Sequence, residues 1–144
     1  MLAILTTHPI QYQVPIWRGL AQRGDVPFTV FYMSEQGLKP RFDPGFGRAI
    51  AWDIDLLSGY PHEFVDVQVG RRQDRFTWLR LKPGFGRMLK ARGVKVLWVQ
   101  GWQVMAYWQA IRSDPGCRFL AAPGQSRSSA FACPAAGIDS MPSA

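Results

Sequence analysis

Residues 2–17 read Leu2-Ala-Ile-Leu-Thr-Thr-His-Pro-Ile-Gln-Tyr-Gln-Val-Pro-Ile-Trp17 and predict a strand, a turn and the beginning of a helix. The apolar run Leu2–Leu5 is typical of a strand buried on both faces of a parallel sheet. We expect the helix to begin near Pro15, because proline suits the first helical turn, and to end at Gly24. In an open α/β sheet, ligands bind at the carboxyl ends of the strands. Three side chains of the turn are therefore candidate binding residues: His8, Gln11 and Tyr12.

The rest of the chain alternates strand and helix patterns. This alternation predicts an α/β fold, a Rossmann-like parallel sheet flanked by helices. Further strands are expected at Phe28–Met33, His62–Val67 and Val94–Val99, with a weak one at Phe119–Ala122. Further helices are expected from Pro83 and from about Gln103. The remaining segments are expected to be a long irregular region, Ser34–Tyr60, with room for short strands around Ala49–Ile54, and a basic loop, Arg71–Lys82.

The positive charge of the chain is concentrated in one segment. The 144 residues carry a formal net charge of +7, and Arg71–Lys95 alone holds nine Lys or Arg residues and one acid, Asp74. A segment of this kind can attract nucleic acid, phosphates or an anionic membrane, or it can be an ordinary solvated surface. Both interpretations stay open at this point.

The last part of the chain has a different composition. Of the 32 residues from Ser113 to Ala144, 22 are Ala, Ser, Pro, Gly or Cys, and none is Trp or Tyr. We expect a domain at residues 1–112 and a low-complexity tail at 113–144, either disordered or translated out of frame. A natural flexible tail is the alternative. No secretory signal or membrane span is recognisable, so the expected location is the cytoplasm, with peripheral contact to the inner face of the plasma membrane as a variant.

Several kinds of chemistry find no support in the residues. His8 and His62 lie far apart, Cys117 and Cys133 lack metal-ligand spacing, and neither a phosphate loop nor a nucleophile elbow occurs. A polar edge remains: Gln100 and Trp102 follow the strand Val94–Val99 and should face the same cleft as His8, which can act as a base or as a hydrogen-bond donor. In the long irregular region, Asp43, Trp52 and Asp53 can add acceptors and a stacking face for a sugar, with ordinary packing of the loop as the alternative.

Four blocks of this sequence resemble the N-terminal region of bacterial glycosyltransferases of family 4. The resemblance covers about residues 1–112, and its first and third blocks are the most specific. The blocks are Ile4-Leu-Thr-Thr-His-Pro-Ile-Gln-Tyr-Gln-Val-Pro15, Asp43-Pro-Gly-Phe-Gly47, Trp52-Asp-Ile-Asp-Leu-Leu-Ser-Gly-Tyr60, and Gly101-Trp102 with Tyr107-Trp-Gln-Ala-Ile111.

The resemblance implies a GT-B architecture, in which two Rossmann-like domains face each other across a cleft. Such enzymes move a sugar from a nucleotide-sugar donor to a hydroxyl acceptor, a sugar or a lipid-linked molecule, without an essential metal or other cofactor. The N-terminal domain mainly holds the acceptor, so His8, Gln11, Tyr12, Trp52, Asp53, Gln100 and Trp102 are expected acceptor-binding residues. Many relatives place a catalytically important His where this chain has Gln100, which cannot titrate, and His8 is the remaining catalytic candidate.

The donor-binding domain has no counterpart in this sequence, so the isolated chain is expected to be inactive in transfer. Two alternatives stay open. The chain can be a basic α/β module that binds a nucleotide or nucleic acid without chemistry, with nucleic acid the less favoured ligand, or it can be the non-functional remnant of a gene.

Overall fold

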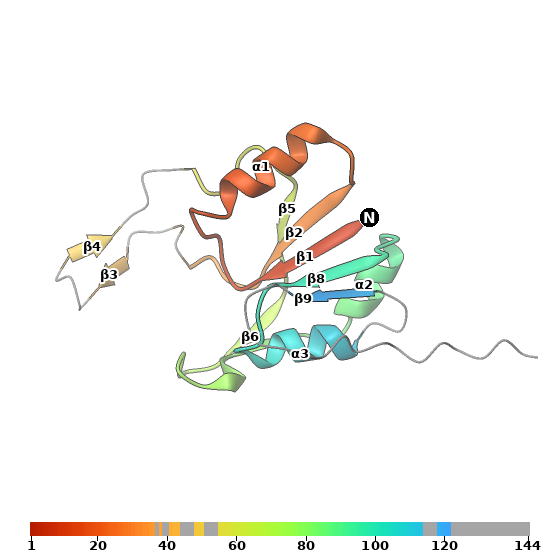
Figure 1. Cartoon of the computed structure of the whole chain (residues 1–144). Coiled ribbons are helices and arrows are strands. Elements are labelled where there is room, and N and C mark those ends of the chain that lie inside the picture. Colours follow the sequence, from red (N-terminus) through yellow and green to blue (C-terminus); the bar gives the residue numbers. More distant parts are fainter. Residues whose placement is uncertain (37, 39–40, 44–47, 51–54, 114–117, 122–144) are drawn as a thin grey trace, which may run out of the picture.

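The computed structural model describes residues 1–36, 38, 41–43, 48–50, 55–113 and 118–121, and its centre is a parallel sheet (Figure 1). The sheet has five strands in the order β5-β2-β1-β8-β9, and every neighbouring pair is parallel. The fold is therefore α/β and Rossmann-like in kind, as the alternating patterns predict. The strands are β1 (Leu2–Thr6), β2 (Phe28–Tyr32), β5 (His62–Phe64), β8 (Val96–Val99) and β9 (Arg118–Ala121).

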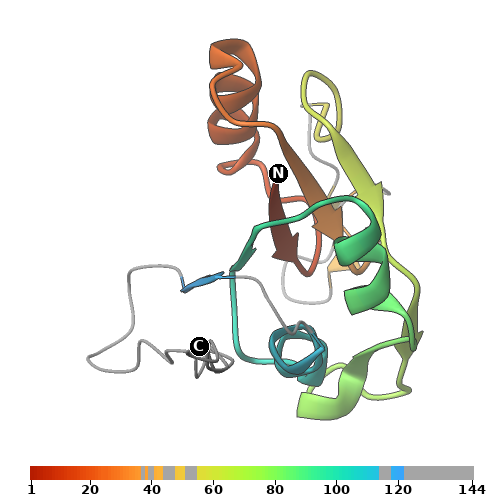
Figure 2. The same cartoon turned by 90° about the vertical axis from the view of Figure 1, so that its right-hand side faces the viewer.

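Helices cover both faces of the sheet. Helix α1 (Val14–Arg23) lies on one face, and α2 (Phe85–Ala91) and α3 (Met105–Arg112) lie on the other, as Figures 1 and 2 show from two directions. The side chains of β1 alternate between the two layers, as strand geometry requires. Ala3 and Leu5 belong to the core cluster under α2 and α3, whereas Ile4 belongs to the cluster under α1.

Helix α1 follows the local signals of its sequence. Val14 and Trp17 are buried, and Gly24 ends the helix in the left-handed conformation, with φ of 68° and its N–H bonded to the Leu20 carbonyl at 3.3 Å. Glycine adopts this conformation without strain. The Trp17 ring packs edge-on against Trp98 of β8, with ring centroids 5.7 Å apart, and this contact fixes the helix over the sheet.

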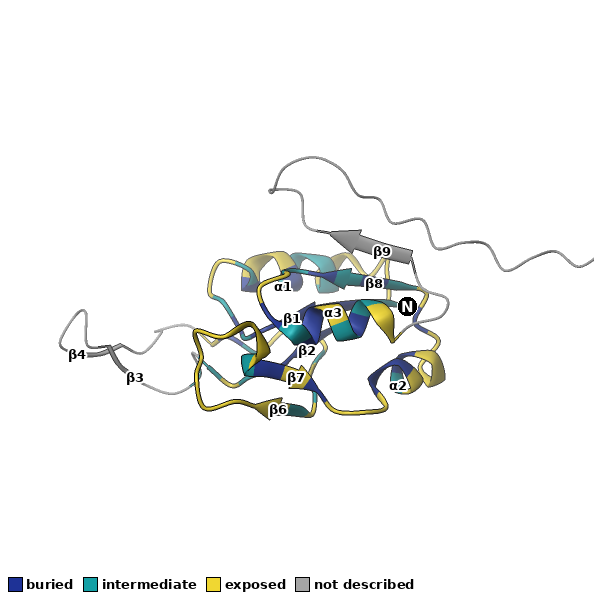
Figure 3. Cartoon of the chain, turned by 90° about the horizontal axis from the view of Figure 1, so that it is seen from below, coloured by how far each residue is buried: buried dark blue, intermediate teal, exposed yellow. Residues whose placement is uncertain are grey.

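The predicted strand His62–Val67 is wrong in its second half. The chain leaves the sheet after β5, and Val67–Val69 forms β6, which pairs antiparallel with β7 (Leu79–Leu81). The basic loop expected at Arg71–Lys82 is therefore a hairpin that carries a 3₁₀ turn, η1 (Phe76–Trp78). Its packing follows from alternation, because Leu79 and Leu81 are buried and Arg80 between them is exposed. Figure 3 shows the exposed loop of this hairpin.

Two further segments correspond to parts of the sequence with weak patterns. A small antiparallel pair, β3 (Arg41–Asp43) and β4 (Arg48–Ile50), lies inside the region expected to be irregular with short strands. Strand β9 coincides with the weak strand expected at 119–122, shifted by one residue. Within the described ranges, no helix has the length and apolar character needed to cross a bilayer.

Candidate functional site

The order of the strands places a topological switch point between β1 and β8. From β1 the chain passes through α1 to β2 on one side, and from β8 it passes through α3 to β9 on the other. Because α1 and α3 cover opposite faces, the loops that leave β1 and β8 diverge. Ligands of open α/β sheets bind in the crevice that such a divergence creates. The candidate site is this switch-point edge, defined by the loops 7–13 and 100–104.

His8 and Gln100 both lie at this edge, as the sequence predicts. The strands β1 and β8 are adjacent and parallel, with Leu5 opposite Val99. The Gln100 N–H bonds to the Leu5 carbonyl at 3.1 Å, which extends the ladder by one residue beyond β8. The two polar residues therefore follow the carboxyl ends of neighbouring strands, His8 two residues after β1 and Gln100 directly after β8.

The imidazole of His8 is partly buried and uncharged at neutral pH. Its Nδ1 lies 3.0 Å from the Thr7 hydroxyl oxygen, and either atom can donate, depending on the tautomer. Burial lowers the pKa of His8 below its ordinary value of 6.5. A neutral imidazole has one donor and one acceptor nitrogen, so Nε2 can serve a ligand hydroxyl in either role.

The turn after β1 is held in place by Met33, which follows β2, and by Tyr107 of α3. The carbonyls of Thr6 and Thr7 accept hydrogen bonds from Met33 N–H at 3.2 and 3.1 Å. Tyr107 is 1% exposed and hydrogen-bonds to Thr6 and Thr7, which partly opposes the rise that burial causes in the pKa of its hydroxyl. The sequence shows Tyr107 only as part of an apolar helical stripe. Its role beneath the site depends on tertiary packing, for which the sequence carries no local signal.

Two glutamine carbonyl oxygens near this edge are buried and unpaired. Oε1 of Gln100 and Oε1 of Gln13, the residue that caps α1, have no hydrogen-bond partner within the described ranges. A buried acceptor without a donor costs about 1–3 kcal/mol, so such atoms are unusual in folded chains. Sequence reasoning identified Gln100 but missed Gln13, because a glutamine at the start of a helix is ordinary on the surface.

The exposed part of the edge is aromatic. Tyr12 is 69% exposed and Trp102 is 61% exposed, and Gln11 is exposed beside Tyr12. The Trp108 indole N–H donates to the Trp102 carbonyl at 3.0 Å and so ties this loop to α3. Between β8 and Trp102, only glycine fits at position 101, since an added Cβ would lie 2.7 Å from the Tyr107 ring and closer still to Gln103.

Other expected site residues cannot be placed with this group. Trp52 and Asp53 lie outside the described residues, and of Asp43 only the backbone, in β3, is described. In the part of the chain that the structure covers, no group of three or more His, Cys, Asp or Glu side chains could hold a metal ion.

The basic segment Arg71–Lys95 is divided between two places. The hairpin half lies beside the start of α3, where Arg80 Nε donates to Met105 Sδ at 3.2 Å and Leu81 N–H donates to Gln109 Oε1 at 2.8 Å. The other half belongs to α2 and the loop after it, where Lys95 N–H bonds to the Met1 carbonyl at the amino end of β1. Only the hairpin half is therefore near the end of the sheet that carries the switch point (Figure 3).

In comparisons with known proteins, no protein-family model, no curated protein and no solved structure matches the chain.

Proposed function

We propose that residues 1–112 form the acceptor-side domain of a GT-B glycosyltransferase of family 4. Its reaction moves a sugar from a nucleotide-sugar donor to a hydroxyl acceptor. The observation that carries the proposal is the switch point between β1 and β8, which has His8 on one side and Gln100 on the other. The likeness of the four sequence blocks to that family supplies the chemistry.

The hydrogen-bonding groups at the edge suit a hydroxyl ligand. The imidazole of His8 is uncharged near neutral pH, and the buried, unpaired Oε1 atoms of Gln13 and Gln100 become acceptors for a ligand when these side chains turn outward. Sugar hydroxyls donate and accept hydrogen bonds, so they can satisfy both kinds of group without bringing a charge into the site. The exposed ring of Trp102 offers an apolar face on which a sugar ring can stack.

The proposal assigns nucleotide-sugar binding to a second domain. Departure of the nucleotide places negative charge on phosphate oxygens, and preorganised donors must stabilise that charge. The groups at the switch point supply none with a permanent positive charge. The chain alone is therefore expected to bind an acceptor and to transfer no sugar.

A binding measurement on the whole chain tests the acceptor site. Methyl glycosides of common hexoses would be titrated into ¹⁵N-labelled protein, and binding should move the amide resonances of His8 and Gln100. Gln100→Met keeps the side-chain length but removes the acceptor, so it should weaken binding about ten-fold. Gln22→Met is the matched control, because Gln22 is exposed on the last turn of α1 at the opposite end of that helix.

Two results would contradict the proposal. Glycosides that shift no resonance at the switch-point edge would remove the acceptor site, and tight, salt-dependent binding of DNA or RNA would favour the basic binding module instead. The gene-remnant alternative is tested by the nucleotide sequence downstream of codon 112, where another reading frame should then encode a second Rossmann-like domain.

We also propose that the hairpin half of the basic segment meets an anionic membrane that carries a lipid-linked acceptor. The support is local. Arg71, Arg72 and Arg75 are exposed in the hairpin loop, and the neighbouring Phe76 is 45% exposed. Arginines with an exposed aromatic ring are typical of surfaces that bind the lipid headgroup region.

A further inference from the structure

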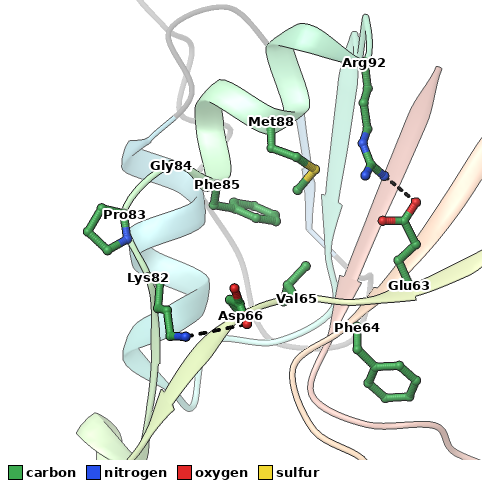
Figure 4. Close-up of a pocket in the computed structure, with 10 residues that line it drawn as sticks. All are labelled: Glu63, Phe64, Val65, Asp66, Lys82, Pro83, Gly84, Phe85, Met88 and Arg92. Atoms are coloured by element: carbon green, nitrogen blue, oxygen red, sulfur yellow. Dashed lines mark hydrogen bonds and ion pairs between the residues drawn. The ribbon is translucent and has the colours of Figure 1, made fainter.

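A cavity of about 350 Å³ lies away from the switch-point edge, between α2 and the segment that leaves β5 (Figure 4). Its lining residues 63–66 lie at or just after β5, the outer strand of the sheet, whereas the switch point lies between β1 and β8. Its volume is in the range of small-molecule sites, about 300–1,000 Å³. Its lining residues are Glu63, Phe64, Val65, Asp66, Lys82, Pro83, Gly84, Phe85, Met88 and Arg92.

The floor of this cavity is apolar (Figure 4). Figure 4 shows the side chains of Val65, Phe85 and Met88 turned toward one another, whereas the ring of Phe64 points away. Phe85 is 8% exposed and packs edge-on against Phe31, with ring centroids 6.2 Å apart. Val65 and Met88 are partly buried members of the same core cluster. The floor is therefore continuous with the core cluster under α2.

Two ion pairs bound the apolar floor. Arg92 Nη1 donates to Glu63 Oε1 at one end, and Lys82 Nζ lies 3.6 Å from Asp66 Oδ1 at the other. The four charges cancel, although the surrounding segment is strongly basic. The Arg92 guanidinium is also held 5.6 Å from the centroid of the Phe31 ring. Arg92 is thus the most fixed of the four charged groups, and its side chain is 37% exposed.

The balance of charge selects the ligand. A ligand in the cavity removes water from the lining charges, and a charge that loses its water without a partner is costly. An ion of one sign would satisfy one member of the Arg92–Glu63 pair and repel the other. A molecule with a carboxylate next to an ammonium can lie antiparallel to this pair, the carboxylate on Arg92 and the ammonium on Glu63.

We propose that this cavity binds a small zwitterion with an apolar body, the class to which aromatic amino acids belong. The amino-acid headgroup pairs with Arg92 and Glu63, and the apolar side chain lies over Val65, Phe85 and Met88. The existing ion pair does not block this arrangement. Partly exposed pairs contribute little to stability, so the pair can open to admit the ligand.

The test uses the full chain labelled with ¹³C at the methionine methyl groups. The Met88 signal is assigned by its loss in Met88→Leu, and L-phenylalanine is titrated against it. The same titration is run with 3-phenylpropionate, which lacks the ammonium, and with phenethylamine, which lacks the carboxylate. We expect L-phenylalanine to shift the Met88 methyl and each analogue to bind about five- to ten-fold more weakly.

Single substitutions distinguish recognition of the amino-acid headgroup from nonspecific binding of the phenyl ring to an apolar surface. Glu63→Gln should weaken L-phenylalanine about five-fold and leave 3-phenylpropionate unchanged or tighter. Lys90→Gln, an exposed position on the same helix outside the lining, is the matched control. The Met33 methyl, 2% exposed, reports whether each variant is folded. A Met88 signal that stays still up to the solubility of L-phenylalanine, or analogues that bind as tightly as the zwitterion, would overturn the proposal.

Discussion

The side chain of His8 makes the stability of the fold sensitive to pH. Burial lowers its pKa below 6.5, so the unfolded chain takes up a proton at a pH where the folded chain does not. The free energy of unfolding should therefore fall as the pH is lowered through about 6.5, with a slope below about 1.4 kcal/mol per pH unit because the ring is partly solvated. His8→Gln should flatten this part of the curve, measured by urea unfolding between pH 5 and 8. Equal slopes in the two proteins would contradict the prediction.

Gly86 is required by the contact between α2 and the end of α3. An added Cβ would overlap the backbone carbonyl oxygen of Ser113, which cannot move without shifting α3. Gly86→Ala should destabilise the fold by about 2 kcal/mol, although alanine favours a helix. The matched control is Gly19→Ala in α1, where the added Cβ has no neighbour within 4 Å and should stabilise by up to about 1 kcal/mol. Thermal unfolding measures both, and stabilisation by both would show that α2 and α3 do not meet this closely.

At the scale of single residues, the sequence predicts the site residues whose position follows from being next to a strand end. His8 follows the first apolar run after two threonines and Gln100 comes directly after the run Val94–Val99, so the strand-end rule locates both without coordinates. Gln13 and Tyr107 are different. The burial of Gln13 Oε1 depends on how α1 packs on the sheet. The contact of the Tyr107 hydroxyl with Thr6 and Thr7 depends on how α3 packs on it. Local patterns do not contain that information.

The hairpin β6–β7 separates two surfaces that form one segment in the sequence. Replacing Arg71, Arg72 and Arg75 by Gln should weaken binding to anionic vesicles about 100-fold, since each basic residue near such a surface contributes about 1 kcal/mol. The control removes the same charge from α2 and the loop after it, with Arg87, Lys90 and Lys95 changed to Gln. Co-sedimentation with vesicles of rising phosphatidylserine content measures both.

The two sets of replacements distinguish a membrane surface from general positive charge. Equal losses in both would mean that net charge alone drives binding, and no response to anionic lipid or to moderate salt would remove the membrane proposal.

The same hairpin shows why the sequence predicts a loop at Arg71–Lys82 where the structure has the strand β7. The pattern Leu79-Arg-Leu81 alternates over only three residues, and four arginines lie between Gly70 and Leu81. A strand this short is hard to recognise, because high charge density favours a loop assignment. The buried pair Leu79 and Leu81 shows that alternation, rather than the local charge, decides the outcome.

For the molecule as a whole, the sheet predicts an uneven pattern of hydrogen exchange. Strand β1 lies between β2 and β8, whereas β5 is an outer strand of the sheet. Val65 N–H bonds to the Tyr32 carbonyl at 2.8 Å, so by alternation the N–H groups of His62 and Phe64 point away from β2. The amides of β1 should exchange slowest and those of His62 and Phe64 among the fastest, as mass spectrometry or NMR can show. Protection of β5 equal to that of β1 would indicate a partner strand at this edge.

The sequence predicts the class of this fold but not its strand order. Alternating strand and helix patterns require a parallel sheet. Each helix crossover returns the chain to the end of the sheet where the previous strand began, so the next strand runs in the same direction. That β8 lies beside β1, and not beyond β5, depends on which face each helix covers. The two core clusters, one under α1 and one under α2 and α3, show this choice only once the chain is folded.

The six tryptophans give the molecule optical signals of its own, because those in the described residues differ widely in exposure. Trp17 is 1% exposed between α1 and the sheet, so its emission should lie at short wavelength and follow unfolding. Trp102 and Trp108 are 61% and 47% exposed beside the switch-point edge, and acrylamide should quench them first. A sugar that stacks on Trp102 would shield that indole from the quencher while Trp17 stays unchanged. Occupancy and integrity of the fold can thus be followed in one cuvette, without any label.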